Sequence, residues 1–235
     1  MLKIFAPNFI YRLFKIITLP AIIFFIVLMS VGLYLAYNAP IDYQQKETVK
    51  IMYIHVPSAW MALGIYLFIG IVSIISIISR IPTAFLLAAS AAPIGMIFAL
   101  ITLVTGAIWG YPIWGTWWVW DARLTSMFVL FLLYIAYIGI LHASSDNIFR
   151  AEKPAAVIAI LGAINVPIVK FSVNLWNSLH QPASIFRASG PSIDPSMLKP
   201  LFIMFIAFIF LFLALCSMKF HIISRKIHNL TRNRI

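Results

Sequence analysis

Five of the seven tryptophans of this 235-residue chain lie within twelve residues, between Trp109 and Trp120. An aspartate and an arginine, Asp121 and Arg123, follow directly. Indole rings are large, rigid and amphipathic, so this cluster predicts a wide aromatic surface with a few polar contacts. Such a surface would suit a flat, hydrophobic, anionic ligand. The alternative is an ordinary interfacial belt, in which aromatic side chains only mark the membrane edge.

Two histidines, His55 and His180, flank the tryptophan segment in the sequence, and each stands two residues before a proline. Neutral imidazole is a common metal ligand. The pair could supply both axial positions of a haem iron while the tryptophans cover the porphyrin. A histidine near a helix end can also be a simple capping or interfacial residue, and that alternative remains open for each one.

We expect residues 114–123 to form a short interfacial helix. Arg123 is the candidate contact for a haem propionate, because a guanidinium group matches a carboxylate bidentately. A salt bridge with Asp121 or a contact with lipid head groups would explain Arg123 equally well. Trp120 would point away from the predicted binding face. The i, i+3, i+4 and i+7 spacing would place four side chains on that face: Trp114, Trp117, Trp118 and Asp121.

The composition places this segment in a membrane protein. Hydrophobic residues make up 63% of the chain, charged residues 10%, and the mean hydropathy is +1.01. A helix needs about 20 apolar residues to cross the hydrocarbon core. We therefore expect an all-α integral membrane fold, with residues 1–235 as a single domain of six transmembrane helices. The expected spans are 17–37, 57–79, 83–106, 126–143, 155–173 and 200–218.

Proline and basic residues refine this topology. Four spans are expected to open on a proline, where the missing N–H costs nothing, at Pro57, Pro82, Pro154 and Pro200. With the N-terminus in the cytoplasm, eleven Lys and Arg residues lie inside and six outside, which the positive-inside rule favours. Both termini are then cytoplasmic. The net charge of +11 is thus a topology signal and predicts no nucleic-acid partner.

This orientation gives three external segments, 38–56, 107–125 and 174–199, which hold both candidate histidines and the external tryptophan-rich segment. The other three histidines, His142, His221 and His228, fall on the inner side and are expected to be interfacial. The single cysteine, Cys216, and the absence of a Cys-x-x-Cys-His motif exclude covalent c-type haem on this chain. No Walker motif, nucleophile triad or paired carboxylates stand out, so we expect no enzyme activity.

Residues 114–125, Trp-Gly-Thr-Trp-Trp-Val-Trp-Asp-Ala-Arg-Leu-Thr, resemble the WWD signature of the haem-handling proteins of cytochrome c biogenesis. Nearly the whole chain is similar to the haem exporter protein C family of the system I pathway. Further similar strings are Ile-Asp-Tyr-Gln-Gln at 41–45, Tyr-Ile-His-Val-Pro-Ser-Ala-Trp at 53–60 and Phe-Ser-Val at 171–173. Two residues depart from the family pattern: Tyr111 replaces a basic residue, and Leu175 stands where a tryptophan often precedes Trp176.

The resemblance implies a haem-binding and haem-presenting function, with haem b held non-covalently and transiently. His55 and His180 would be its axial ligands, and residues 114–121 would hold the porphyrin. The implied partners are a periplasmic haem chaperone (CcmE-like), ATP-binding-cassette transporter subunits (CcmA/CcmB-like) and a small one-span subunit (CcmD-like). The implied location is the bacterial cell inner membrane, or the mitochondrial inner membrane.

Two other functions remain as alternatives. A haem permease subunit should carry polar or ionisable residues facing the bundle interior, and the expected spans show few. Asn165, beside Pro167 in the fifth span, is the one weak candidate. A membrane b-type electron-transfer cytochrome would place histidine pairs near mid-membrane, and no histidine of this chain lies deep in an expected span.

Overall fold

The computed structural model describes residues 5–176, 178–180, 184–185, 187 and 190–232, with side chains as far as Asn229. Within these residues, six helices are long and apolar enough to cross a membrane, which confirms the expected all-α multi-pass fold. Two short 3-10 helices, η2 (Glu47–Ile51) and η3 (Ile148–Ala151), precede the second and fifth spans. The spans are α1 (Pro7–Tyr37), α2 (Met52–Ser79), α3 (Pro82–Trp114), α4 (Ala122–Ala143), α5 (Glu152–Leu175) and α6 (Pro195–Arg232).

The helix limits differ from the sequence prediction in two ways. Pro82 does open α3, but α2 and α6 each begin five residues before Pro57 and Pro200, and Pro154 is the third residue of α5. The helices are also longer than the apolar runs. The third span continues from the expected end at residue 106 to Trp114, and the basic segment after residue 218 is helical to residue 232. Hydropathy locates the apolar centre of a helix and not its ends. The added part of α6 is basic, whereas the added part of α3 is aromatic and includes Gly110 and Pro112, which the sequence prediction took as the end of the helix.

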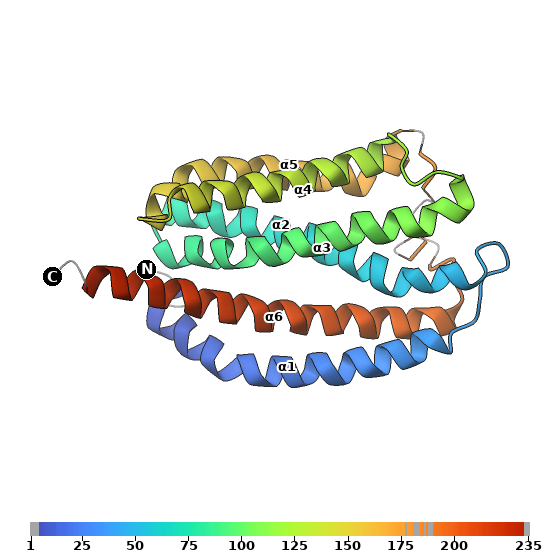
Figure 1. The fold of residues 1–235 in the computed structure, drawn as a ribbon, viewed down its shortest axis with the longest axis horizontal. Coiled ribbons are helices and arrows are strands. Elements are labelled where there is room, and N and C mark those ends of the chain that lie inside the picture. The colour runs from blue at the N-terminus through green and yellow to red at the C-terminus, as the bar shows by residue number, and fades with distance from the viewer. Residues whose placement is uncertain (1–4, 177, 181–183, 186, 188–189, 233–235) are drawn as a thin grey trace.

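Helices α2, α3, α4 and α5 form a bundle, α6 packs against α2 and α3, and α1 packs on α6 at the periphery (Figure 1). Helix α1 has few buried residues and carries many exposed apolar side chains, so it presents most of its surface to lipid. The N-terminal end of α1 and the C-terminal end of α6 lie at the same end of the molecule (Figure 1), as an even number of spans requires.

Buried tyrosines fill the middle of the bundle. The Tyr134 hydroxyl donates to the carbonyl of Ala62 at 2.7 Å, and the Tyr66 hydroxyl donates to the carbonyl of Ile158 at 3.1 Å. The two rings meet edge to face, with centroids 4.5 Å apart. Glycines leave room for them, because a Cβ at Gly95 would lie 2.2 Å from the Tyr134 hydroxyl and a Cβ at Gly162 would lie 2.0 Å from the Tyr66 ring. This dense packing at mid-membrane counts against a passage through that level of the bundle.

Candidate functional site

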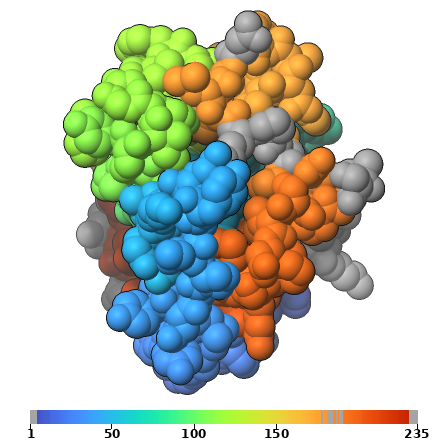
Figure 2. All heavy atoms as spheres, turned by 90° about the vertical axis from the view of Figure 1, so that its right-hand side faces the viewer, coloured from blue at the N-terminus to red at the C-terminus, as the bar shows by residue number. Residues whose placement is uncertain are grey.

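The three segments predicted to be external come together at one end of the bundle. Figure 2 views this end, with the connection between α3 and α4 in green, the segment before α2 in blue and the segment before α6 in orange. His55 lies on the first turn of α2, and His180 lies in the connection between α5 and α6. Two histidines separated by 125 positions are thereby brought to the same end of the protein.

The expected interfacial helix over residues 114–123 is not formed, and that prediction was wrong. Helix α3 instead continues to Trp114 and ends at Gly115, whose φ of 71° is left-handed and whose N–H donates to the carbonyl of Tyr111. The chain from 115 to 121 is non-helical. The Asp121 side chain accepts a hydrogen bond from the Leu124 N–H and so caps α4. The spacing of the aromatic residues fits a helical period, but the left-handed conformation of Gly115 ends the helix within this segment.

His180 is held by a buried carboxylate. Its Nδ1 lies 3.2 Å from Oδ2 of Asp121, and its backbone N–H donates to the Ser178 hydroxyl at 3.1 Å. The same Asp121 oxygen also accepts a hydrogen bond from the Ser178 hydroxyl. The Trp114 ring meets the imidazole edge to face, with centroids 4.9 Å apart. These contacts fix the imidazole orientation through Nδ1, and no described hydrogen bond occupies Nε2.

His55 is held by a different set of groups. Its Nδ1 lies 3.0 Å from the hydroxyl oxygen of Thr105 on α3. The Thr105 hydroxyl donates to the Ile101 carbonyl at 2.6 Å, so its oxygen accepts from the imidazole. The ring also lies against Trp109, at 5.6 Å between centroids, and over Gly106, where a Cβ would stand 2.9 Å from Cε1. The backbone of Thr102, also a neutral group, is a further hydrogen-bond partner of this imidazole. As with His180, the described side-chain partner engages Nδ1, which leaves Nε2 as the possible ligand atom.

Both histidines line a single cavity of about 180 Å³. Its walls include Trp114, Trp118 and Arg123, together with apolar residues of α2, α3 and α4. Two imidazoles are a donor set that suits a haem iron, and an aromatic wall suits the flat porphyrin. Pockets that enclose a small molecule usually measure about 300 to 1,000 Å³. A haem would therefore have only part of its surface inside this cavity.

The predicted aromatic residues divide into two groups. Trp114 and Trp118 line the cavity, and the buried indole N–H of Trp118 has no hydrogen-bond partner among the described atoms. Trp117 stacks on Tyr111, with centroids 4.3 Å apart, and is 56% exposed, whereas Trp120 is 73% exposed. Neither of these two lines the cavity. The site and the outer aromatic surface are thus made by different tryptophans.

Arg123 lines the cavity from the first turn of α4. Its Nε donates to the Ser172 hydroxyl at 3.4 Å, and its guanidinium donates to the Lys170 carbonyl at 3.3 Å. Both acceptors lie in the last two turns of α5. Among the described residues, Asp121 lies within salt-bridge distance of His180 but not of Arg123, so the predicted alternative of an Arg123–Asp121 salt bridge is not supported. The structure thus gives Arg123 a role in joining α4 to α5 beside the cavity.

Burial and hydrogen bonding set the protonation states of Asp121 and His180. Burial lowers the pKa of His180, and Asp121 offsets only part of that effect. The imidazole is therefore neutral near pH 7, the state that can bind a metal. For Asp121, burial acts to raise the pKa, but hydrogen bonds from Ser178, Leu124 and His180 bring it below its ordinary value. The carboxylate therefore stays charged and accepts the Nδ1–H hydrogen bond.

Sequence reasoning missed several residues that build this site. Thr105 and Gly106 support His55, Ser178 supports Asp121, and Trp109 donates from its indole to the Gln45 side chain at 2.8 Å. No motif could have indicated Thr105, because threonine is common in membrane spans. His55 and Thr105 are 50 positions apart, so only the packing of α2 against α3 reveals the pair.

Comparison with known proteins shows the family of this chain. The family model "Heme exporter protein C" matches residues 1–233. The chain belongs to the haem exporter protein C family. It is 48% identical over 207 residues to the haem exporter protein C of Bradyrhizobium diazoefficiens, covering 87% of this chain and 78% of that protein. It is 41% identical over 177 residues to the Escherichia coli K12 family member, covering 75% and 71%.

A relative from a plant extends the comparison. The putative cytochrome c biosynthesis ccmC-like mitochondrial protein of Marchantia polymorpha is 46% identical over 185 residues, covering 78% of each chain. Membership of the haem exporter protein C family indicates a multi-pass membrane protein that takes part in haem handling for cytochrome c maturation.

The two groups of tryptophans predict different effects of substitution. If haem occupies this cavity, Trp118→Ala should lower the haem content of the purified protein, because burying an indole ring against a porphyrin would stabilise the complex by about 1 to 3 kcal/mol. Trp120→Ala, a matched control on the exposed surface, should leave haem content near that of wild type. Pyridine haemochrome assays on both variants measure this. Equal losses in the two variants would contradict the division.

Proposed function

We propose that this protein binds haem b non-covalently at its outer face and presents it to a periplasmic haem chaperone during cytochrome c maturation. The observation that carries the proposal is that His55 and His180 line one cavity, each engaged through Nδ1 by another side chain. Both Nε2 atoms then serve as axial ligands to the haem iron. Membership of the haem exporter protein C family supports this assignment.

Each group around the cavity has a role in this function. Asp121 and Thr105 fix the tautomer and orientation of the two imidazoles. Trp114 and Trp118 supply the apolar wall for the porphyrin, and Arg123 provides a cation for a propionate. The small cavity leaves part of the haem accessible to a partner. A ligand from the chaperone would replace one histidine while the other histidine and the tryptophans still held the haem, so the released histidine position would be filled by the incoming ligand.

The setting follows from charge and topology. The excess of Lys and Arg at the end of the bundle opposite the tryptophans supports a cytoplasmic location for that end. The histidines then face the periplasm, in a bacterial inner membrane or its mitochondrial equivalent. Membership of the haem exporter protein C family supports further proposed partners, namely ATP-binding-cassette transporter subunits and a small one-span subunit of the same exporter system.

Spectroscopy of the purified full chain tests the binding step. Haem co-purified with the protein in detergent should show a six-coordinate, low-spin absorption spectrum, as two imidazole ligands give. Acidified organic solvent should extract all of it, because no cysteine pair is present to bind haem covalently. A purely high-spin spectrum, or haem that remains on the chain after extraction, would contradict the proposal.

A further inference from the structure

We infer that the two axial histidines are unequal, with His180 the retained ligand and His55 the ligand that gives way when haem is passed on. This inference rests on the proposed function. It comes from the different acceptors that the structure places behind the two imidazoles, a carboxylate behind one and a hydroxyl behind the other.

The carboxylate behind His180 is itself firmly held. Asp121 is buried, accepts from the Leu124 N–H at 2.8 Å through Oδ1, and accepts from Ser178 and His180 through Oδ2. An ionised acceptor at Nδ1 increases the electron density of the imidazole and strengthens the bond that Nε2 makes to a metal. His180 is thus the stronger ligand, and Asp121 acts on the iron only through it, as a positioning residue.

The Thr105 hydroxyl polarises the imidazole of His55 much less than Asp121 polarises that of His180. Thr105 is neutral, and its own proton is committed to the Ile101 carbonyl. A hydrogen bond to a neutral acceptor is about half as strong as one to a charged acceptor. The imidazole of His55 is therefore well placed by α3 but is weakly polarised. A competing imidazole from a partner displaces the weaker of two ligands, and here that is His55.

Haem retention by the two ligand variants measures the inequality. Purified His55→Ala protein should keep more haem than His180→Ala protein and should bind added imidazole in the open position. Asp121→Asn keeps the helix cap but removes the charge, so it should raise the midpoint potential of the bound haem and reduce its affinity on the order of tenfold. Thr105→Val, the matched change behind His55, should shift the potential less.

Equal haem retention by the two histidine variants would overturn the inequality, as would an unchanged potential in Asp121→Asn. These results differ from a failure of the proposed function. If the wild-type protein gave no low-spin haem spectrum, the function itself would be wrong. A low-spin wild type with two equivalent histidines would contradict only the inference.

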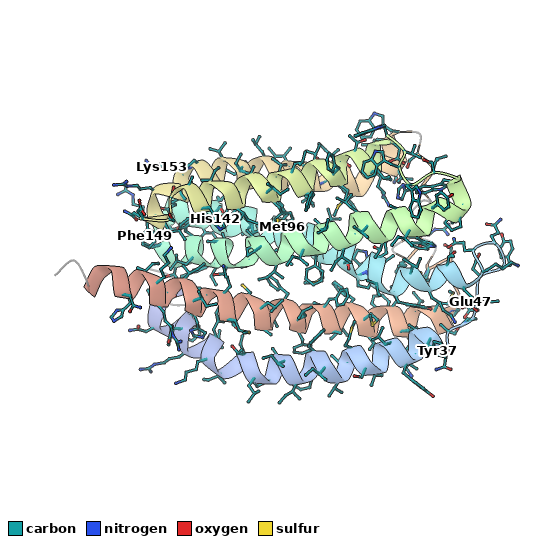
Figure 3. The ribbon with its side chains drawn as sticks, viewed as in Figure 1. Tyr37, Glu47, Met96, His142, Phe149 and Lys153 are labelled. Atoms are coloured by element: carbon teal, nitrogen blue, oxygen red, sulfur yellow. The ribbon has the colours of Figure 1, made fainter. Side chains whose placement is uncertain are left out.

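At the opposite end of the bundle, we propose a second binding site, for the anionic head group and upper chain of an acidic membrane phospholipid. A cavity of about 430 Å³ lies there between α3, α4 and α6. His142 and Phe149, which line it, both lie at the end of the molecule away from Glu47 (Figure 3). Pockets of this size are large enough for a small ligand.

The walls of this inner cavity divide by chemistry. Pro93, Leu141 and Ile223 contribute an apolar side. Lys219 and Lys226 stand two turns apart on α6, and both line the cavity with exposed side chains. One acid, Asp146, is also present, so the lysines give the lining a net positive charge. Basic pockets between membrane helices on the cytoplasmic side bind anionic lipid head groups, and the apolar side suits the start of an acyl chain.

Native mass spectrometry of the full chain with added phosphatidylglycerol or phosphatidylcholine tests this site. Wild type should retain phosphatidylglycerol preferentially, and a Lys219→Gln, Lys226→Gln double variant should lose most of that preference. The control is Lys153→Gln with Arg225→Gln, which removes two exposed cations of the same end that do not line the cavity. Equal losses in both double variants would overturn the site. Retention of glycerol phosphate as strong as that of the lipid would show a free phosphate site instead.

Discussion

His55→Ala and His180→Ala should each abolish the six-coordinate, low-spin haem spectrum of the purified protein. Each substitution removes one of the two Nε2 ligands, and a haem with one protein imidazole becomes five-coordinate or takes a weak solvent ligand. His180→Ala should in addition lose most of its haem, since the carboxylate-backed ligand is gone. Absorption spectra of the ferric and ferrous proteins, with haem content from the pyridine haemochrome, measure both effects.

His142, which does not line the cavity that holds His55 and His180, provides the control for this result. His142 lies at the other end of the bundle, and its Nδ1 is engaged by the carbonyl of Ile138. His142→Ala should therefore leave the spectrum unchanged. Low-spin spectra that persist in both His55→Ala and His180→Ala proteins would show that other residues ligate the iron.

Gly106→Val should strongly reduce haem binding, although Gly106 itself supplies no ligand to the haem iron. A Cβ at this position would stand 2.9 Å from Cε1 of His55, so a valine side chain pushes the imidazole away from α3. The hydrogen bond from Nδ1 of His55 to Thr105 is then lost. The Nε2 atom of His55 also moves away from the position in which it and Nε2 of His180 could bind the same iron. The loss of low-spin haem in this variant should approach that of His55→Ala.

Gly64→Val is the matched control, because no atom lies within 4 Å of a Cβ built there. Both variants place the same side chain on a membrane helix, and only one of them crowds His55. Circular dichroism and size-exclusion profiles should show that both proteins are folded. The steric account of His55 placement fails if the two glycine variants bind haem equally well.

Much of this architecture could be predicted from the sequence because the bilayer imposes simple rules. Long apolar runs located the six spans, and the distribution of Lys and Arg gave an orientation. The sequence also indicated His55, His180 and the tryptophans as chemically distinctive residues. Residue type and helical spacing do not show which tryptophans face inward, however. Trp114 and Trp118 line the cavity, whereas Trp117 and Trp120 do not, because Gly115 ends the helix that would have aligned them.

The supporting residues were beyond the reach of sequence reasoning. Asp121 could be noticed as part of a motif, but its hydrogen bond to His180 joins residues 59 positions apart. Thr105 carries no signal of its own and becomes meaningful only because α2 packs against α3. Such side-chain pairs depend on helix rotation and register, which periodicity leaves undetermined. The structure therefore adds the difference between the two histidines, which the motif alone leaves equivalent.

The outer aromatic surface has a separate meaning under this account. Trp117 is stacked on Tyr111, Trp120 packs edge to face on Trp118, and Trp117, Tyr111 and Trp120 are all exposed at the end of the bundle that holds the candidate site. Exposed aromatic groups of this kind are typical of contact surfaces. Under the proposed function, Trp114 and Trp118 would contact haem, and the more exposed Trp117 and Trp120 would be available for contact with a partner.

The most direct test of the relay is haem loading of the periplasmic chaperone in cells that express a His55→Ala, His180→Ala double variant. The chaperone is purified and stained for covalent haem, and co-purification with the variant shows whether the two proteins still meet. The account predicts that the complex forms but that the chaperone carries little or no haem, because the donor cannot hold the iron. Haem loading at the wild-type level by the double variant would contradict it.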